Sequence, residues 1–238
     1  MEAQNITFTL ASETVQTEPT EVQTGFDFPQ PLTEKYAPQG IADFVGLDKV
    51  KNAMTKLAAK PFKSAWYFEG PSGTGKTQMA LALARALPAE LHHIAARRCT
   101  LEEVERVTKS CQYHAHNPAD LRQAYDWHLI LVDEADLMTQ PAQEAWLSYL
   151  DGTRPLPNTI VIFTANSHDG MADRFMSRVR SLPFSSYGIS TQVADLLQRV
   201  WMQETNSSEC PNFQRIVKDS ANNVRASLMA LETEIMCA

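Results

Sequence analysis

The chain has 238 residues, a hydrophobic content of 44%, a charged content of 21% and a formal net charge of −7. No stretch approaches the roughly eighteen apolar residues of a membrane span, no signal-like segment follows Met1, and the four cysteines are scattered. We therefore expect a cytoplasmic protein with no membrane partner and no disulfide framework. The acidic average disfavours extensive nonspecific DNA binding, although it is compatible with a local basic patch.

The first thirty residues differ in composition from the rest of the chain. Residues 1–30 are rich in Thr, Glu and Gln and contain no Lys or Arg. They lack a helical apolar period, although residues 6–10 alternate as in a short strand. We expect a flexible acidic tail. Phe26 and Phe28 are unusual in a purely solubilising tail, so a segment that orders against a partner is the alternative.

Apolar strands alternate with helical stretches over the middle of the chain. The predicted strands are Trp66–Phe68, Leu91–Ile94, Leu129–Val132, Thr159–Thr164 and Leu182–Phe184. Continuous apolar strands separated by helices indicate an α/β fold with a parallel sheet covered on both faces, and ligand sites at the carboxyl ends of the strands. Helices alone are predicted beyond Gly188. The expected organisation is the tail over 1–30, an α/β domain over 31–187 and a small helical lid domain over 188–238.

A glycine-rich loop joins the first of these strands to the next helix. It comprises Gly70, Pro71, Ser72, Gly73, Thr74, Gly75, Lys76 and Thr77, in the pattern Gly-x-x-x-x-Gly-Lys-Thr. Its glycines allow backbone N–H groups to face phosphate oxygens, the following helix presents its positive dipole end, and Lys76 adds a full charge. The hydroxyl of Thr77 is suited to Mg²⁺. A chance loop is the alternative, and the strand and helix on either side favour a P-loop for a nucleoside triphosphate.

Polar residues follow two later strands. Leu129–Val132 runs directly into Asp133 and Glu134, which predicts a Walker B site with Asp133 on Mg²⁺ and Glu134 polarising the attacking water. Asn166 follows Thr159–Thr164, and its amide would orient the same water. An acidic strand end and a turn asparagine are the ordinary alternatives. Their order after the glycine-rich loop favours the catalytic roles.

A wider set of motifs has a known counterpart. It comprises Glu34-Lys35-Tyr36-Ala37-Pro38, Asp43-Phe44-Val45-Gly46, the glycine-rich loop, Asp133-Glu134-Ala135-Asp136 with Met138-Thr139 and Ala142-Gln143, the strand before Asn166, and Ser177-Arg178. Together these resemble the AAA+ ATPases, and more narrowly the replication factor C small subunits of the clamp-loader clade. The resemblance extends from about Leu32 to Leu231. It implies an AAA+ P-loop NTPase sheet followed by a helical lid, with ATP and Mg²⁺ as cofactors.

Further site residues are implied by the resemblance alone. Arg178 matches the arginine finger that reaches the nucleotide of a neighbouring subunit, so catalysis would require a homo- or hetero-oligomer. Arg225 matches the sensor arginine of the lid, which touches the γ-phosphate. Tyr36, Val45 and Gly46 lie where the family forms its adenine pocket. The alternatives are surface cations for the two arginines and ordinary packing for the other three.

The chain also departs from the clamp-loader pattern. Residues 146–149 are Trp-Leu-Ser-Tyr where clamp loaders commonly carry paired arginines that face DNA, and Ala37 and Val179 replace the usual arginine and cysteine. The sequence ends after the lid, without the helical collar that holds such rings together. We therefore expect assembly to depend on ATP or on another partner, as in a trimmed relative among mobile-element or phage-type replication or recombination ATPases.

Two smaller groups have both functional and ordinary interpretations. Arg97 and Arg98 follow the second strand, where related ring ATPases project a loop toward the central channel, and a solvated loop is the alternative. Cys99, Cys111, His114 and His116 carry side chains that zinc prefers, but their spacing is irregular, which favours helix packing with exposed histidines.

Two functions follow from these observations. The first is an ATP-hydrolysing oligomer that assembles or remodels a replication- or recombination-type complex on nucleic acid. The alternative is a nucleotide-gated protein-interaction or protein-remodelling ATPase that recruits its partner through the acidic tail and does not contact DNA. The negative net charge favours the alternative, and the motif set favours the first.

Overall fold

The computed structural model describes residues 30–237 except 96, 98, 114, 117–123, 155 and 206–209. The predicted tail, including the alternating segment and the two phenylalanines, lies outside the described residues. Arg98 and His114 lie outside them as well.

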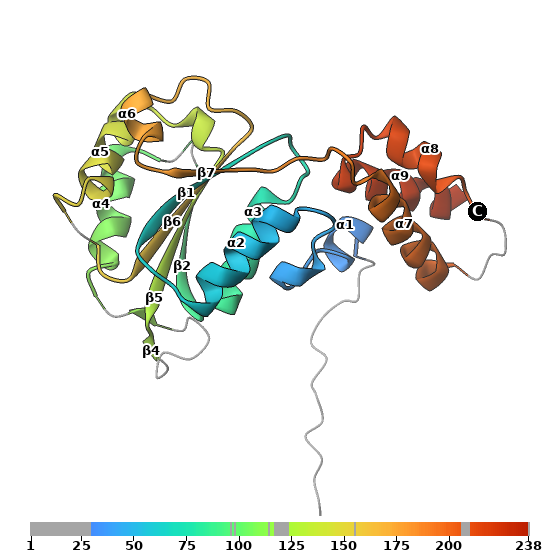
Figure 1. The fold of residues 1–238 in the computed structure, drawn as a ribbon, viewed down its shortest axis with the longest axis horizontal. Helices are drawn as coiled ribbons and strands as arrows, with labels where there is room; N and C mark the ends of the chain where they lie inside the picture. Colours follow the sequence, from blue (N-terminus) through green and yellow to red (C-terminus); the bar gives the residue numbers. More distant parts are fainter. Residues whose placement is uncertain are drawn as a thin grey trace, which may run out of the picture. The chain divides into compact units, whose positions relative to one another are not determined.

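A five-stranded parallel sheet forms the centre of the fold (Figure 1). Its strands are β1 (Ser64–Glu69), β2 (Ala89–Ala95), β5 (Trp127–Asp133), β6 (Thr159–Ala165) and β7 (Arg180–Pro183), in the spatial order β2-β5-β6-β1-β7. Every neighbouring pair is parallel, so the five predicted strands and the α/β class are confirmed. A two-stranded antiparallel ladder, β3 (Ala115–His116) with β4 (Ala124–Tyr125), was not predicted.

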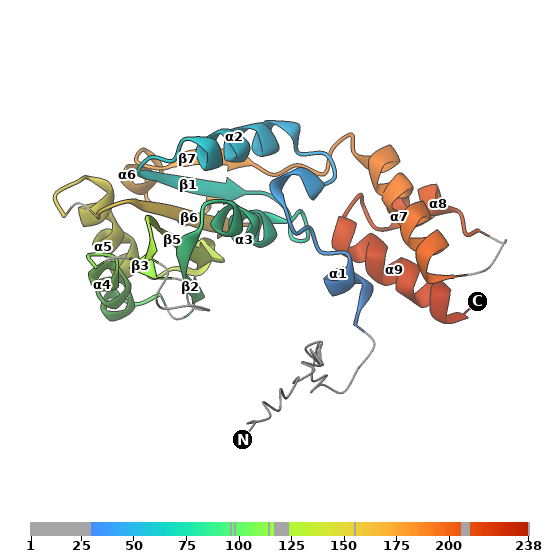
Figure 2. The ribbon, with the colours of Figure 1, turned by 90° about the horizontal axis from the view of Figure 1, so that it is seen from below.

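Helices cover both faces of this sheet, as Figures 1 and 2 show. One face packs against α2 (Asp48–Ala59) and α3 (Lys76–Ala86), and the other packs against α4 (Leu101–Ser110) and α5 (Gln140–Leu150). The side chains of β5 alternate between the two cores: Leu129 and Leu131 join the first, whereas Ile130 and Val132 join the second. Burial on both faces explains why this strand reads as a continuous apolar run.

The remaining elements are short helices and the helices that follow the sheet. They are α1 (Leu32–Lys35), the 3-10 turns η1 (Ile41–Asp43) and η3 (Ala135–Leu137), α6 (Asp173–Met176), α7 (Ser190–Glu204), α8 (Phe213–Asp219) and α9 (Val224–Cys237). The last three helices enclose an apolar core of their own, which includes Val193, Leu197 and Leu231. Leu32 joins that core, and its N–H donates to Glu232 Oε1 at 3.0 Å. Within the described ranges no helix combines the length and apolar character needed to cross a bilayer.

Trp146 of α5 belongs to the core. Its side chain is 0% exposed and meets Phe163 of β6 edge-on, with ring centroids 5.4 Å apart. Phe163 in turn contacts Phe175, at 5.0 Å between centroids. At this position α5 therefore directs an aromatic ring into the protein, and the helix contains no Lys or Arg.

We expect Trp146→Ala to lower the free energy of unfolding by about 3–5 kcal/mol, because it removes a large buried ring and leaves a cavity. Urea denaturation followed by circular dichroism would measure the loss. Trp146→Phe keeps most of the apolar surface and should lose clearly less. A loss below about 1 kcal/mol for the alanine variant would mean that the ring is not a core group.

Candidate active site

The glycine-rich loop connects β1 to α3, which begins at Lys76. Gly73 has a φ of +76°, and a Cβ built there would lie 2.2 Å from Asn223 Oδ1, so only glycine fits. Asn223 immediately precedes α9, and its Nδ2 donates to the carbonyl of Ser72 at 2.7 Å. A residue of the predicted lid thus closes one side of the loop. Asn223 was not predicted as a site residue.

The Lys76 ammonium lies inside the loop. Its Nζ donates to the carbonyl of Gly70 at 2.5 Å, to that of Pro71 at 2.9 Å and to Asn166 Oδ1 at 3.2 Å. Burial lowers the pKa of Lys76, and the charges of Asp136 and Asp133 oppose that effect. The loop carbonyls therefore hold a cation where phosphate oxygens are expected to bind.

The Asp133 carboxylate accepts hydrogen bonds from hydroxyl groups on two other elements. Thr77 Oγ1 of α3 donates to Asp133 Oδ1 at 2.8 Å, and Thr164 Oγ1 of β6 donates to the same oxygen. The backbone N–H of Glu134 donates to Thr164 Oγ1 at 3.2 Å. Thr164 was predicted as the end of a strand but not as a site residue. The hydroxyl of Thr77 and the carboxylate of Asp133 supply the hard oxygen ligands that Mg²⁺ prefers.

Glu134 and Asn166 face the same region from the ends of adjacent strands. Glu134 is exposed and has a φ of +57°, in the left-handed region that non-glycine residues rarely adopt. The N–H of Asn166 donates to Asp136 Oδ2 at 3.3 Å. Because β6 lies between β5 and β1, both residues come beside the glycine-rich loop at the carboxyl ends of the strands.

Two adjoining cavities result. The first is polar and is lined by residues that include Lys76, Thr77, Asp133, Glu134, Asn166 and Arg225. The second is lined by Tyr36 and Val45 together with Phe44, Leu47, Val224 and Leu228. Gly73, Gly75 and Arg225 line both, so the two cavities meet at the loop. An apolar pocket beside a polar one matches the base and the phosphates of a nucleotide.

Tyr36 and Gly46, two of the predicted adenine-pocket residues, also contact the two ends of α7. The hydroxyl of Tyr36 donates to Glu204, which forms an ion pair with Lys35 at 2.8 Å. Burial and the neighbouring Glu204 raise the pKa of Tyr36 to about 12. Gly46 is not among the residues that line the second cavity, and a Cβ there would lie 2.4 Å from Ile189 Cγ2. Gly46 therefore packs closely against the start of α7, and its part in an adenine pocket stays a prediction.

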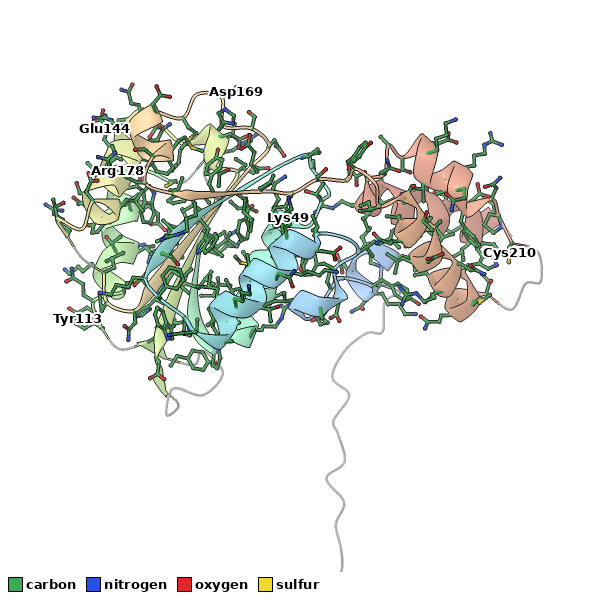
Figure 3. All side chains as sticks on the ribbon, viewed as in Figure 1. Lys49, Tyr113, Glu144, Asp169, Arg178 and Cys210 are labelled. Carbon is green, nitrogen blue, oxygen red and sulfur yellow. The ribbon has the colours of Figure 1, made fainter. Side chains whose placement is uncertain are left out.

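Arg178 lies apart from both cavities. Its guanidinium donates to the Asp151 carboxylate and, at 3.1 Å, to Ser177 Oγ. Together with Ser64 it lines a depression at the amino end of β1, whereas the glycine-rich loop follows the carboxyl end. The length of β1 separates these ends by about 17 Å. Figure 3 shows Arg178 near α5 and α6. This arginine therefore does not meet the glycine-rich loop of its own chain.

Comparison with known proteins identifies the family. Residues 66–186 match the sequence profile of the ATPase family associated with various cellular activities (AAA). The chain belongs to the AAA family. The matched range contains the glycine-rich loop, Asp133, Glu134, Asn166 and Arg178.

Among curated relatives, this AAA chain is similar to replication factor C subunits, as the resemblance predicted. It is 34% identical to replication factor C small subunit 2 of Pyrobaculum islandicum over 158 residues, which are 64% of this chain and 47% of that protein. It is 26% identical to the replication factor C large subunit of Methanococcoides burtonii over 205 residues, 84% of this chain and 40% of that protein. The AAA chain thus matches less than half of either relative's length.

Solved structures confirm the fold of the AAA chain. The Thermotoga maritima RuvB Holliday junction branch migration motor superimposes with a TM-score of 0.68 at 15% identity, covering 85% of this chain and 65% of RuvB. At that identity the likeness concerns the fold alone.

The smaller predicted groups of the AAA chain are only partly described. Arg97 is exposed, as a channel loop or a solvated loop would require. Cys99 and Cys111 are buried, and burial raises the pKa of the Cys111 thiol to about 12. The side chain of His116, like all of His114, lies outside the described residues. Cys111 is instead grouped with His92 and His128, which sequence analysis did not connect with it.

Proposed function

We propose that this chain binds and hydrolyses Mg-ATP as a subunit of a homo- or hetero-oligomer, and that hydrolysis drives assembly or remodelling of a replication- or recombination-type protein–nucleic acid complex. The observation that carries the proposal is the convergence of Lys76, Thr77, Asp133, Glu134 and Asn166 in one polar cavity. Membership in the AAA family and similarity to replication factor C proteins support it.

Binding follows from the two adjoining cavities. The adenine would lie among Tyr36, Val45 and the apolar side chains of the second cavity, while the phosphates enter the glycine-rich loop. Lys76 would exchange its carbonyl contacts for phosphate oxygens. Thr77 and Asp133 would hold Mg²⁺, which neutralises phosphate charge when bound.

Hydrolysis follows from the groups at the strand ends. Glu134 is exposed at the polar cavity, so its carboxylate would accept the proton of the attacking water, and Asn166 would orient that water. Arg225 would contact the γ-phosphate from α9. Since Arg178 lies near the other end of β1, it would act on the nucleotide of a neighbouring subunit.

One observation favours the second candidate, an ATPase that remodels proteins without contacting DNA. α5 carries no basic residue, and its Trp146 is buried. Binding to nucleic acid would therefore depend on basic residues outside α5, and the exposed Arg97 is our candidate.

Steady-state ATPase activity with and without DNA distinguishes the two functions. We expect DNA to raise turnover of the wild-type chain at low salt, with a stimulation that weakens steeply as salt increases. Arg97→Glu should remove the stimulation and leave basal turnover unchanged, whereas Arg199→Glu, at an exposed position on α7, should keep it. An ATPase rate that is the same with and without DNA would refute the nucleic-acid role and support protein remodelling.

A further inference from the structure

Two strands and the end of one helix bring three metal-binding side chains together, away from the nucleotide cavities. His92 lies on β2, His128 on β5, and Cys111 directly after α4. One ligand atom from each lies within 4.8 Å of the other two. Register places Glu90 beside His128 and His92 beside Ile130, so the two histidines and Glu90 share the sheet face that α4 covers.

The hydrogen bonds of His128 orient its ring for coordination. His128 Nε2 lies 2.9 Å from the carbonyl oxygen of Tyr113, which can only accept, so this nitrogen carries the proton. His128 Nδ1 therefore has a lone pair, and it lies 3.0 Å from His92 Nε2. A histidine that donates one N–H to a backbone carbonyl and presents its other nitrogen is the usual arrangement of a metal ligand.

The Glu90 carboxylate supplies a fourth donor on the same face. Its Oε2 lies 3.6 Å from His128 Nδ1, and its Oε1 lies 3.9 Å from His92 Nε2. Ligands of a tetrahedral Zn²⁺, with bonds of about 2.0–2.3 Å, lie about 3.3–3.7 Å apart. The nitrogen and oxygen spacings of 3.0–3.9 Å are close to these values. The Cys111 sulfur lies within 4.8 Å of both histidine nitrogens, whereas Glu90 lies outside that three-residue group, so Glu90 and Cys111 must approach each other when the ion binds. A thiolate with two imidazoles favours zinc over Mg²⁺ or Ca²⁺, which prefer oxygen donors.

We propose that Glu90, His92, Cys111 and His128 bind one Zn²⁺ in a closed structural site that fixes the end of α4 to β2 and β5. On binding, the Cys111 thiol releases its proton to solvent, and the proton on His92 moves from Nε2 to Nδ1. The thiolate and the carboxylate then balance the charge of the ion. His128 lies near the amino end of β5 and Asp133 at the carboxyl end, about 17 Å away, so this site is separate from the proposed Mg-ATP site. Figure 3 labels Tyr113, whose carbonyl supports the site.

Cobalt substitution tests the proposal on the full chain. Cys210 and Cys237 are exposed and would bind metal adventitiously, so both are first changed to serine. Titration of the metal-free protein with Co²⁺ should produce a thiolate-to-cobalt charge-transfer band and tetrahedral ligand-field bands that saturate at one equivalent and disappear when Zn²⁺ is added. Cys111→Ser should abolish the charge-transfer band. Cys99→Ser is the matched control, since this buried cysteine lies outside the group, and it should keep the band.

Further measurements keep the test decisive if Cys111→Ser does not fold. His92→Gln, at a less buried position, should weaken Zn²⁺ binding about 100-fold or more. Zinc-edge absorption of the unmodified chain should report one sulfur and three nitrogen or oxygen ligands. Zinc should raise the melting temperature of the wild-type chain and leave that of His92→Gln unchanged. A folded protein that shows no band, or a band that survives Cys111→Ser, would overturn the proposal, and neither readout depends on ATP hydrolysis.

Discussion

Glu134→Gln is expected to slow ATP hydrolysis by about 10²–10⁴-fold while Mg-ATP still binds. Glutamine keeps the shape of the side chain but does not accept a proton from water. Lys76, Thr77 and Asp133, which we propose bind the phosphates and Mg²⁺, are unchanged in this variant. Single-turnover hydrolysis would measure the rate, and a fluorescent ATP analogue would measure affinity.

The matched control for this variant is Glu144→Gln. Glu144 is an exposed glutamate on α5 that pairs with Arg174 at 2.9 Å, outside the polar cavity. Its variant should hydrolyse ATP at the wild-type rate. A Glu134→Gln protein that turns over within about threefold of wild type would exclude Glu134 as the base.

Arg178→Ala is expected to lower turnover by about 10³–10⁵-fold, again without loss of nucleotide affinity. The guanidinium is held by Asp151 within its own chain and lies near the end of β1 remote from the glycine-rich loop. It would therefore supply transition-state charge only across a subunit interface. Arg174→Ala, one turn earlier and also exposed, should have little effect.

Mixing the two inactive variants tests the interface directly. A homo-oligomer that contains both Glu134→Gln and Arg178→Ala chains has some interfaces at which an intact Glu134 meets an intact Arg178. Activity should then return in proportion to those interfaces. Failure to recover activity in chains that demonstrably co-assemble, or unchanged turnover by a monomeric Arg178→Ala protein, would contradict action across an interface.

The fold was predictable where burial on both faces imposes a continuous apolar run. Leu129 to Val132 show this, because neighbouring residues enter opposite cores. The β3–β4 ladder was missed because strands of two residues have no period to detect. Trp146 could be located on a helix, but only tertiary packing against Phe163 shows that it belongs to the core.

The site was predictable where a local motif carries the chemistry. The P-loop pattern indicated Lys76 and Thr77, and the apolar strand indicated Asp133. Thr164 and Asn223 were missed, since each reaches the site through contacts between distant segments and has no local signature. The partners of Cys111 were missed for a related reason: only strand register places the two histidines on one face.

The contact of Asn223 with the glycine-rich loop constrains which substitutions this protein can accept during evolution. Because the space that a side chain at position 73 would need is filled by Asn223, the two positions are not free to vary independently. Replacing Asn223 by a smaller residue would leave room beside the loop, but it would remove the side-chain amide that donates a hydrogen bond to the carbonyl of Ser72. Among descendants of this protein we therefore expect glycine to persist at position 73, because its φ of +76° disfavours a side chain even where Asn223 is replaced, and we expect the asparagine to persist with it.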